Sequence, residues 1–132
     1  MLRYLAAAAA AALLMTGGAQ AQSSFTESCS NFGFVYSGNS PAIEAMCLKP
    51  DGTPNATTMI LTGIMNVKGV LTNLNSGVPS SFQSMCGSIE IFSDGPIVTL
   101  SAYCNNGSGG FNETSLQLNN INNQNGVLVQ GQ

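Results

Sequence analysis

The sequence contains no histidine and no tryptophan, and only 7% of its residues are charged. Histidine is the commonest general base, so its absence removes the Ser-His and Cys-His arrangements of nucleophilic catalysis. The six acidic residues are scattered and form no recognisable motif, which argues against a glycosidase-type pair of carboxylates. Without histidine or a C-x-x-C pair, a zinc site is also disfavoured. The sequence therefore favours a non-enzymatic protein without a metal or another cofactor.

Basic side chains are almost as scarce. Arg3 is followed by only Lys49 and Lys68, so the chain beyond residue 21 has two basic and six acidic side chains and a net charge of −4. A protein that binds nucleic acid needs a basic surface to neutralise phosphates, which this composition excludes. No apolar run after residue 21 is long enough to span a membrane, which takes about 20 residues.

The first 21 residues have the pattern of a secretory signal peptide. Arg3 precedes an apolar run over residues 5–15, and Ala19-Gln20-Ala21 is an A-x-A cleavage pattern. The apolar run is too short to cross about 30 Å of hydrocarbon. We therefore predict cleavage after Ala21, a secreted, extracellular protein, and a mature chain of residues 22–132 that forms one domain.

The mature chain consists of two copies of one unit. Residues 57 positions apart match without a gap, from about residues 24–74 to residues 81–131, and residues 75–80 between them have a loop-like composition. The matched positions include both pairs of cysteines and a closing Gly-Val-Leu. They are Phe25 and Phe82, Cys29 and Cys86, Cys47 and Cys104, Leu61 and Leu118, and residues 69–71 and 126–128.

Four cysteines in a short secreted chain indicate disulfides, and sequence alone allows three connectivities. Two copies of one unit should close in the same way, so the repeat predicts Cys29–Cys47 and Cys86–Cys104. A loop of about 15 residues closed in this way contributes roughly 3 kcal/mol in the chain-entropy model. A unit this small needs such a bond because its core is small.

Local patterns favour strands. In residues 43–48, Ile43, Ala45 and Cys47 fall on one face, while Glu44, like Glu90 in the other repeat, points outward. Residues 32–36, 89–92 and 97–103 carry β-branched and aromatic side chains, and Asp94-Gly95-Pro96 is typical of a turn. The dipeptides at 125–126 and 68–69 predict hairpin turns. Short helical turns are expected only near residues 25–28 and 82–85, so the fold is predicted to be all-β.

Several motifs occur twice, in the same order, over nearly the whole mature chain. They are S-F-x-x-x-C at 24–29 and 81–86, a strand that ends in the second cysteine, N-x-T at 55–57 and 112–114, and N-x-x-G-x-L at 66–71 and 123–128. With these motifs the chain resembles the cyanovirin-N homology (CVNH) family of lectins.

The resemblance implies an all-β domain of two pseudo-symmetric tandem repeats. Each repeat would have a three-stranded sheet plus a hairpin, short 3₁₀ turns and one disulfide, with strand exchange between the repeats. Members of this family bind mannose-rich oligosaccharides near the two ends of the domain. The expected partners are therefore oligosaccharides or glycoproteins, and the expected state is a monomer or a domain-swapped dimer.

The family's two sites map onto matching positions of this chain. The second-repeat end comprises Asn66, Val67, Lys68, Ser81, Ser84, Asn105 and Asn106. The first-repeat end comprises Ser24, Ser28, Leu48, Lys49, Asn123, Gln124 and Asn125. Neutral amides and hydroxyls suit sugar recognition.

The second-repeat end is expected to be the better site. Asn105 and Asn106 follow a disulfide cysteine and precede a stretch of small residues, 107–110. At the first-repeat end, Leu48 and Pro50 place an apolar wall where the family has polar contacts.

Three N-glycosylation motifs are present, at Asn55, Asn112 and Asn106, and each is either a glycan acceptor or an unmodified loop residue. Two other functions stay open at this point. The same scaffold could serve as a non-catalytic structural or protein-interaction domain, because a fold does not fix a function. A secreted hydrolase is the weaker alternative, and it would require two carboxylates that face each other across a cleft.

Overall fold

The computed structural model describes residues 22–74 and 77–131, and the predicted signal peptide lies outside them. The first repeat contains the 3₁₀ turn η2 (Phe25–Glu27), then β2 (Cys29–Ser37), β3 (Ser40–Leu48), β4 (Pro54–Ile60), β5 (Ile64–Val67) and β6 (Val70–Asn73). The second contains η3 (Phe82–Ser84), then β7 (Cys86–Asp94), β8 (Ile97–Asn105), β9 (Phe111–Leu118), β10 (Ile121–Gln124) and β11 (Val127–Gln130). The predicted strands and both short helical turns are confirmed.

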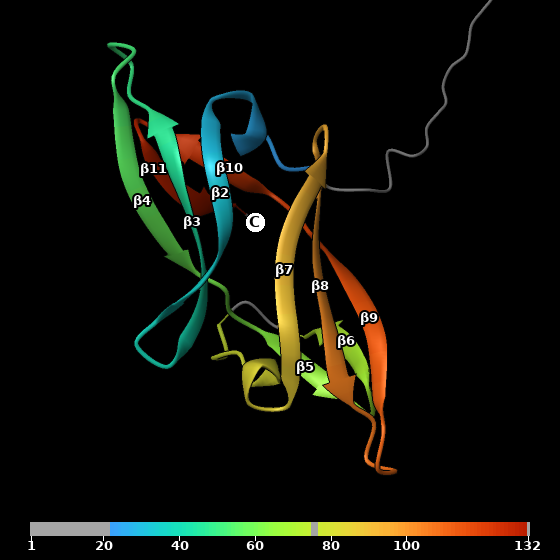
Figure 1. Cartoon of the computed structure of the whole chain (residues 1–132). Helices are drawn as coiled ribbons and strands as arrows, with labels where there is room; N and C mark the ends of the chain where they lie inside the picture. Colours follow the sequence, from blue (N-terminus) through green and yellow to red (C-terminus); the bar gives the residue numbers. More distant parts are fainter. Residues whose placement is uncertain (1–21, 75–76, 132) are drawn as a thin grey trace, which may run out of the picture.

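Each repeat forms an antiparallel three-stranded sheet and a separate hairpin. The sheets have the orders β2-β3-β4 and β7-β8-β9, and the hairpins are β5–β6 and β10–β11. Each hairpin lies against the sheet of the other repeat, with β6 beside β9 and β11 beside β4 (Figure 1). This exchange confirms the predicted two-repeat, all-β fold.

The hairpin turns follow from their sequences. Lys68 and Gly69 have φ values of 52° and 89°, and Asn125 and Gly126 have 57° and 92°. Two successive residues with positive φ make the tight turn that suits the right-handed twist of a hairpin, and glycine accepts this conformation without a steric cost. Both predicted turns are confirmed.

Both disulfides join residues that are directly opposite in neighbouring strands. Cys29 pairs with Cys47 between β2 and β3, and Cys86 pairs with Cys104 between β7 and β8. The pairing predicted from the repeat is therefore confirmed, and it fixes the start of each sheet to the end of its second strand.

The core lies between the two sheets and is made of matching residues from both repeats. Ile43, Ala45 and Cys47 point inward from β3 as predicted, and Glu44 is exposed between them. The largest fully buried side chains come in equivalent pairs or near-pairs, among them Phe25, Phe82, Ile43, Leu100, Leu61, Ile64 and Ile121.

Two buried serines join the beginning of each repeat to the hairpin of the other repeat. The Ser80 hydroxyl donates to the Leu61 carbonyl at 2.7 Å and accepts a hydrogen bond from the Ile64 N–H at 3.0 Å. Ser23, 57 positions earlier, makes the corresponding two bonds in the other half.

The family resemblance implied a third strand in each sheet, but the sequence patterns did not locate β4 and β9. The N-x-T segments 55–57 and 112–114 lie inside these strands and not in loops. Their half-buried positions hold polar residues such as Asn55 and Thr57, so the apolar alternation that reveals a strand is missing.

Candidate functional site

The two ends of the domain are built where an exchanged hairpin meets the chain that follows a disulfide. At the second-repeat end, the Asn66 side chain in β5 donates from Nδ2 to the Asn105 carbonyl at 2.9 Å. Its Oδ1 accepts a hydrogen bond from the Gly69 N–H at 2.7 Å, so the same amide closes the β5–β6 turn. One amide therefore fixes the turn and joins it to the other repeat.

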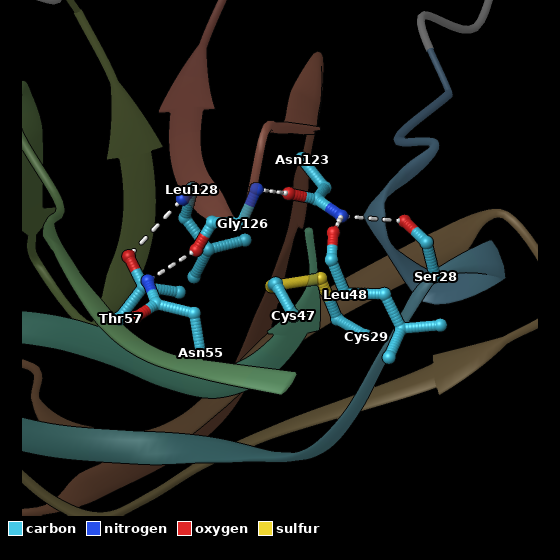
Figure 2. Close-up of a disulfide and its surroundings, with 9 residues drawn as sticks. All are labelled: Ser28, Cys29, Cys47, Leu48, Asn55, Thr57, Asn123, Gly126 and Leu128. Atoms are coloured by element: carbon cyan, nitrogen blue, oxygen red, sulfur yellow. Dashed lines mark hydrogen bonds between the residues drawn. A yellow bond between two sulfur atoms is a disulfide. The ribbon is translucent and has the colours of Figure 1, made fainter. Parts of the chain in front are cut away.

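The first-repeat end repeats this arrangement with one bond more. Asn123 in β10 donates from Nδ2 to the Ser28 hydroxyl and to the Leu48 carbonyl, both at 2.9 Å (Figure 2). Its Oδ1 accepts from the Gly126 N–H at 2.7 Å. Both N–H groups of the Asn123 amide are therefore used within the protein.

The threonines of the N-x-T segments complete the docking of the hairpins. The Leu128 N–H donates to the Thr57 hydroxyl at 3.1 Å, and Asn55 donates to the Gly126 carbonyl at 2.8 Å (Figure 2). In the other half, the Leu71 N–H donates to the Thr114 hydroxyl at 3.0 Å. The sequence marked these residues as glycosylation motifs and as part of the family resemblance, and their recurrence at the repeat offset was a signal that they serve the fold.

Asn105 and Asn106 organise the loop that follows β8. Asn105 Oδ1 accepts the Gly107 N–H at 2.8 Å, and Asn106 Oδ1 accepts the Ser108 N–H at 2.8 Å. Asn106 Nδ2 donates to Asn112 Oδ1 at 3.2 Å. Within residues 22–74 and 77–131, no hydrogen bond occupies the amide nitrogen of Asn105, so two N–H donors remain for a ligand.

Lys49 is the first-repeat equivalent of Asn106. The two side chains differ in how they pack against the hairpin turn beside them. The Lys49 stem lies over Gly126, where an added Cβ would sit 2.7 Å from Cγ. Asn106 lies over Gly69, where an added Cβ would sit 3.0 Å from the Asn106 Cβ. A long cationic side chain therefore borders the first-repeat turn, whereas a short amide borders the second.

The remaining predicted residues lie at the same two ends. Ser24 donates to the Asn122 side chain at 2.6 Å, and Ser84 donates to the Ser81 carbonyl at 2.9 Å. Residues at the two hairpin turns are exposed, which leaves them available: Val67, Lys68, Gln124 and Asn125. The structure thus gathers the predicted residues into the expected two groups.

Charge is weak at both ends. The Thr53 hydroxyl and backbone N–H donate to Asp51 and hold the pKa of this exposed carboxyl below its ordinary value of 3.8. No group of three or more acidic or cysteine side chains that could hold a metal ion is found in the described part of the chain. No helix there is long and apolar enough to cross a membrane. The groups that these ends offer for hydrogen bonding are therefore neutral amides and hydroxyls, with two lysines.

Two tandem repeats with exchanged hairpins, one disulfide each and amide-lined ends define a pseudo-symmetric, disulfide-bonded β domain. The CVNH domain model matches residues 25–129, and the chain belongs to the CVNH family. Proteins of this family bind carbohydrates and are not catalysts, so the prediction that this chain is not an enzyme is confirmed.

Solved structures agree with this assignment. TbCVNH from T. borchii is 26% identical, with a TM-score of 0.64 over 82% of this chain and 99% of that chain. Microvirin in complex with mannobiose is 29% identical, with a TM-score of 0.60 over 81% and 97%. A MoCVNH3 variant in complex with (N-GlcNAc)4 shares the fold at 16% identity, with a TM-score of 0.63 over 85% and 99%. A search of curated protein sequences gives no match.

Proposed function

We propose that the protein is a secreted lectin that binds mannose-type oligosaccharides at the ends of the domain, and that the second-repeat end is the stronger site. The observation that carries the proposal is the set of open donors there. Among the described residues, neither N–H group of Asn105 has a partner, and Asn66 uses only one of its two. Both amides are fixed through their oxygen atoms, so a sugar hydroxyl would meet donors that are already oriented.

The first-repeat end offers less to a sugar. Both N–H groups of Asn123 are occupied, and Leu48, in the place of Asn105, is an exposed apolar side chain. Mannose as the ligand is supported by the relative whose complex contains mannobiose. The first-repeat end is accordingly the weaker of the two proposed sites.

The direct test is titration of Asn105→Ala with an oligomannoside by calorimetry. The substitution keeps the main-chain bond from Asn66 and removes the two side-chain donors together with the Oδ1 that accepts the Gly107 N–H. Loss of one polar contact costs about 1–3 kcal/mol, which is a large share of the roughly 4 kcal/mol of a millimolar affinity. We expect affinity to fall at least fivefold, whereas the matched control Lys49→Ala at the other end should change it less than twofold.

The opposite ranking of the two variants would place the site at the first-repeat end. If the wild-type protein binds no glycan on an array, the lectin proposal fails. The alternative, a structural or protein-interaction domain on the same scaffold, would then be favoured.

Secretion, oligomeric state and glycosylation belong to the same proposal. A secreted protein should have a mass that starts at Gln22, and light scattering should show a monomer or a swapped dimer. Of the three glycosylation motifs, Asn112 is the exposed one, whereas Asn55 already donates its amide to Gly126. A mass unchanged by an amidase that removes N-glycans would exclude modification.

A further inference from the structure

A hollow of about 230 Å³ lies between the two repeats, beside the start of β7. One wall is formed by Phe34 and Tyr36 of β2, and the other by residues 86–89 of β7. These strands come close without pairing, as their neighbouring positions in Figure 1 illustrate. Pockets for drug-sized ligands measure about 300–1,000 Å³, so this hollow suits something smaller.

The first wall is aromatic. Phe34 and Tyr36 are two residues apart on one face of β2, and their rings meet edge to face with centroids 5.1 Å apart. Phe34 is half-buried against the core, whereas Tyr36 is 54% exposed. The inner ring therefore anchors the outer one, which offers apolar surface and a hydroxyl to the hollow.

The second wall is small and polar. An added Cβ at Gly87 would meet nothing within 4 Å, so this side of the hollow is open. Ser88 lies at the β-bulge of β7 and has a φ of 51°, a conformation that costs a non-glycine residue energy. Its hydroxyl has no hydrogen-bond partner in the described part of the chain, so Ser88 can offer a donor and an acceptor to a ligand in the hollow.

The pseudo-symmetric position of the molecule has no such wall. There, Ile91 and Ser93 stand in place of Phe34 and Tyr36. Phe32, the counterpart of Ile89, packs edge to face on Phe25 at 5.2 Å. The second repeat folds with Ser93 at the position equivalent to Tyr36. An aromatic ring at this position is therefore not needed for the fold of the repeat.

We propose that this hollow is an additional carbohydrate subsite that takes one pyranose ring. The apolar C–H face of the sugar would pack on Tyr36, and its hydroxyl rim would bond to Ser88 and the tyrosine hydroxyl. The proposal rests on the proposed lectin function, because it assigns the same ligand class to a second surface. An amphipathic ring matches a hollow with one apolar and one polar wall.

The test uses Tyr36 as a built-in probe and Phe92 as its control. Tyr36 lines the hollow, whereas Phe92, 50% exposed on β7, lies outside its lining and opposite Thr99. In protein labelled at aromatic rings, titration with mannobiose should shift the Tyr36 ring signals and leave those of Phe92 unchanged. Tyr36→Ala should weaken binding at this subsite about threefold to tenfold, and Phe92→Ala should not.

A serine variant separates binding from folding. Ser88→Gly removes the hydroxyl and also relieves the positive φ, so the thermal midpoint should stay the same or rise while the Tyr36 shift weakens. A fall of stability and binding together would mean that Ser88 acts through the fold, and would overturn its assigned role.

The outcomes distinguish this subsite from the proposed function. If backbone signals of Asn105 and Asn106 move on titration while the Tyr36 ring stays silent, the subsite is wrong and the end site stands. If no signal moves at either place, the proposed function fails as well. Tyr36 signals that depend on protein concentration but not on sugar would show that a second copy of the chain covers the hollow, which also overturns the subsite.

Discussion

Amide side chains have two roles in this molecule: some join the two repeats, and one keeps its N–H donors without a partner among the described residues. Asn66 and Asn123 were predicted as sugar contacts from the family's sites, and the structure shows both joining a hairpin to the opposite repeat. Asn105 instead uses only its oxygen within the protein. The sequence predicted that all three lie near the ends. It could not tell which amides hydrogen-bond within the protein and which keep free donors, because that depends on the groups around each side chain.

The first residue-scale prediction concerns Asn123. Asn123→Ala removes two donated bonds and one accepted bond at a half-buried position, so we expect a loss of about 2–3 kcal/mol in unfolding free energy. Chemical denaturation measures this loss. The control is Gln124→Ala on the exposed end of the same strand, which should change stability by less than about 0.5 kcal/mol. An equal loss of unfolding free energy in Asn123→Ala and Gln124→Ala would mean that the hydrogen bonds of Asn123 do not stabilise the fold.

The second residue-scale prediction concerns pH and Asp51. Its pKa is lowered because the Thr53 hydroxyl and N–H favour the carboxylate. A lowered folded-state pKa means that the stabilising contribution is present above the unfolded value and is lost as pH falls through the folded one. NMR should therefore show Asp51 titrating below 3.8, and Thr53→Ala should move the value upward. A value at or above 3.8 in the wild type would contradict the hydrogen bonds.

At the scale of elements, the strands that sequence reveals are those with an apolar face. Residues 43–48 and 97–103 alternate clearly, because their inward side chains enter the core. Strands β4 and β9 have polar inward positions, because they receive the exchanged hairpins through Thr57 and Thr114. A pattern based on hydrophobicity cannot detect a strand whose inner face is designed to hydrogen-bond to another element.

Thr57→Val tests the docking of the hairpin. The change keeps the shape of the side chain and removes the acceptor of the Leu128 N–H, which then lacks a partner in a half-buried place. We expect a loss of about 1–2 kcal/mol and faster hydrogen exchange at Leu128. Thr58→Val, one residue further along β4 and exposed, is the matched control and should affect neither measurement. Unchanged exchange at Leu128 in Thr57→Val would refute the docking role.

At the scale of the whole molecule, the repeat predicted the disulfides, and the family resemblance implied the three-stranded sheet and hairpin of each half. The offset of 57 residues gave equivalent positions, which the structure confirms in both sheets and both hairpins. The proposed sugar sites differ where the two repeats depart from that symmetry. At equivalent positions of the two repeats, Lys49 corresponds to Asn106, Leu48 to Asn105, and Tyr36 to Ser93. Each of these differences changes the groups that the surface offers to a ligand.

The central claim is that the second-repeat end is the principal sugar site, and an ¹⁵N-labelled NMR titration of the wild-type protein with an oligomannoside tests it most directly. The account predicts that the amide signals of Asn105, Asn106 and Lys68 shift at lower sugar concentration than those of residues 123–125. Shifts that begin at residues 123–125 while Asn105 and Asn106 stay unchanged would contradict it.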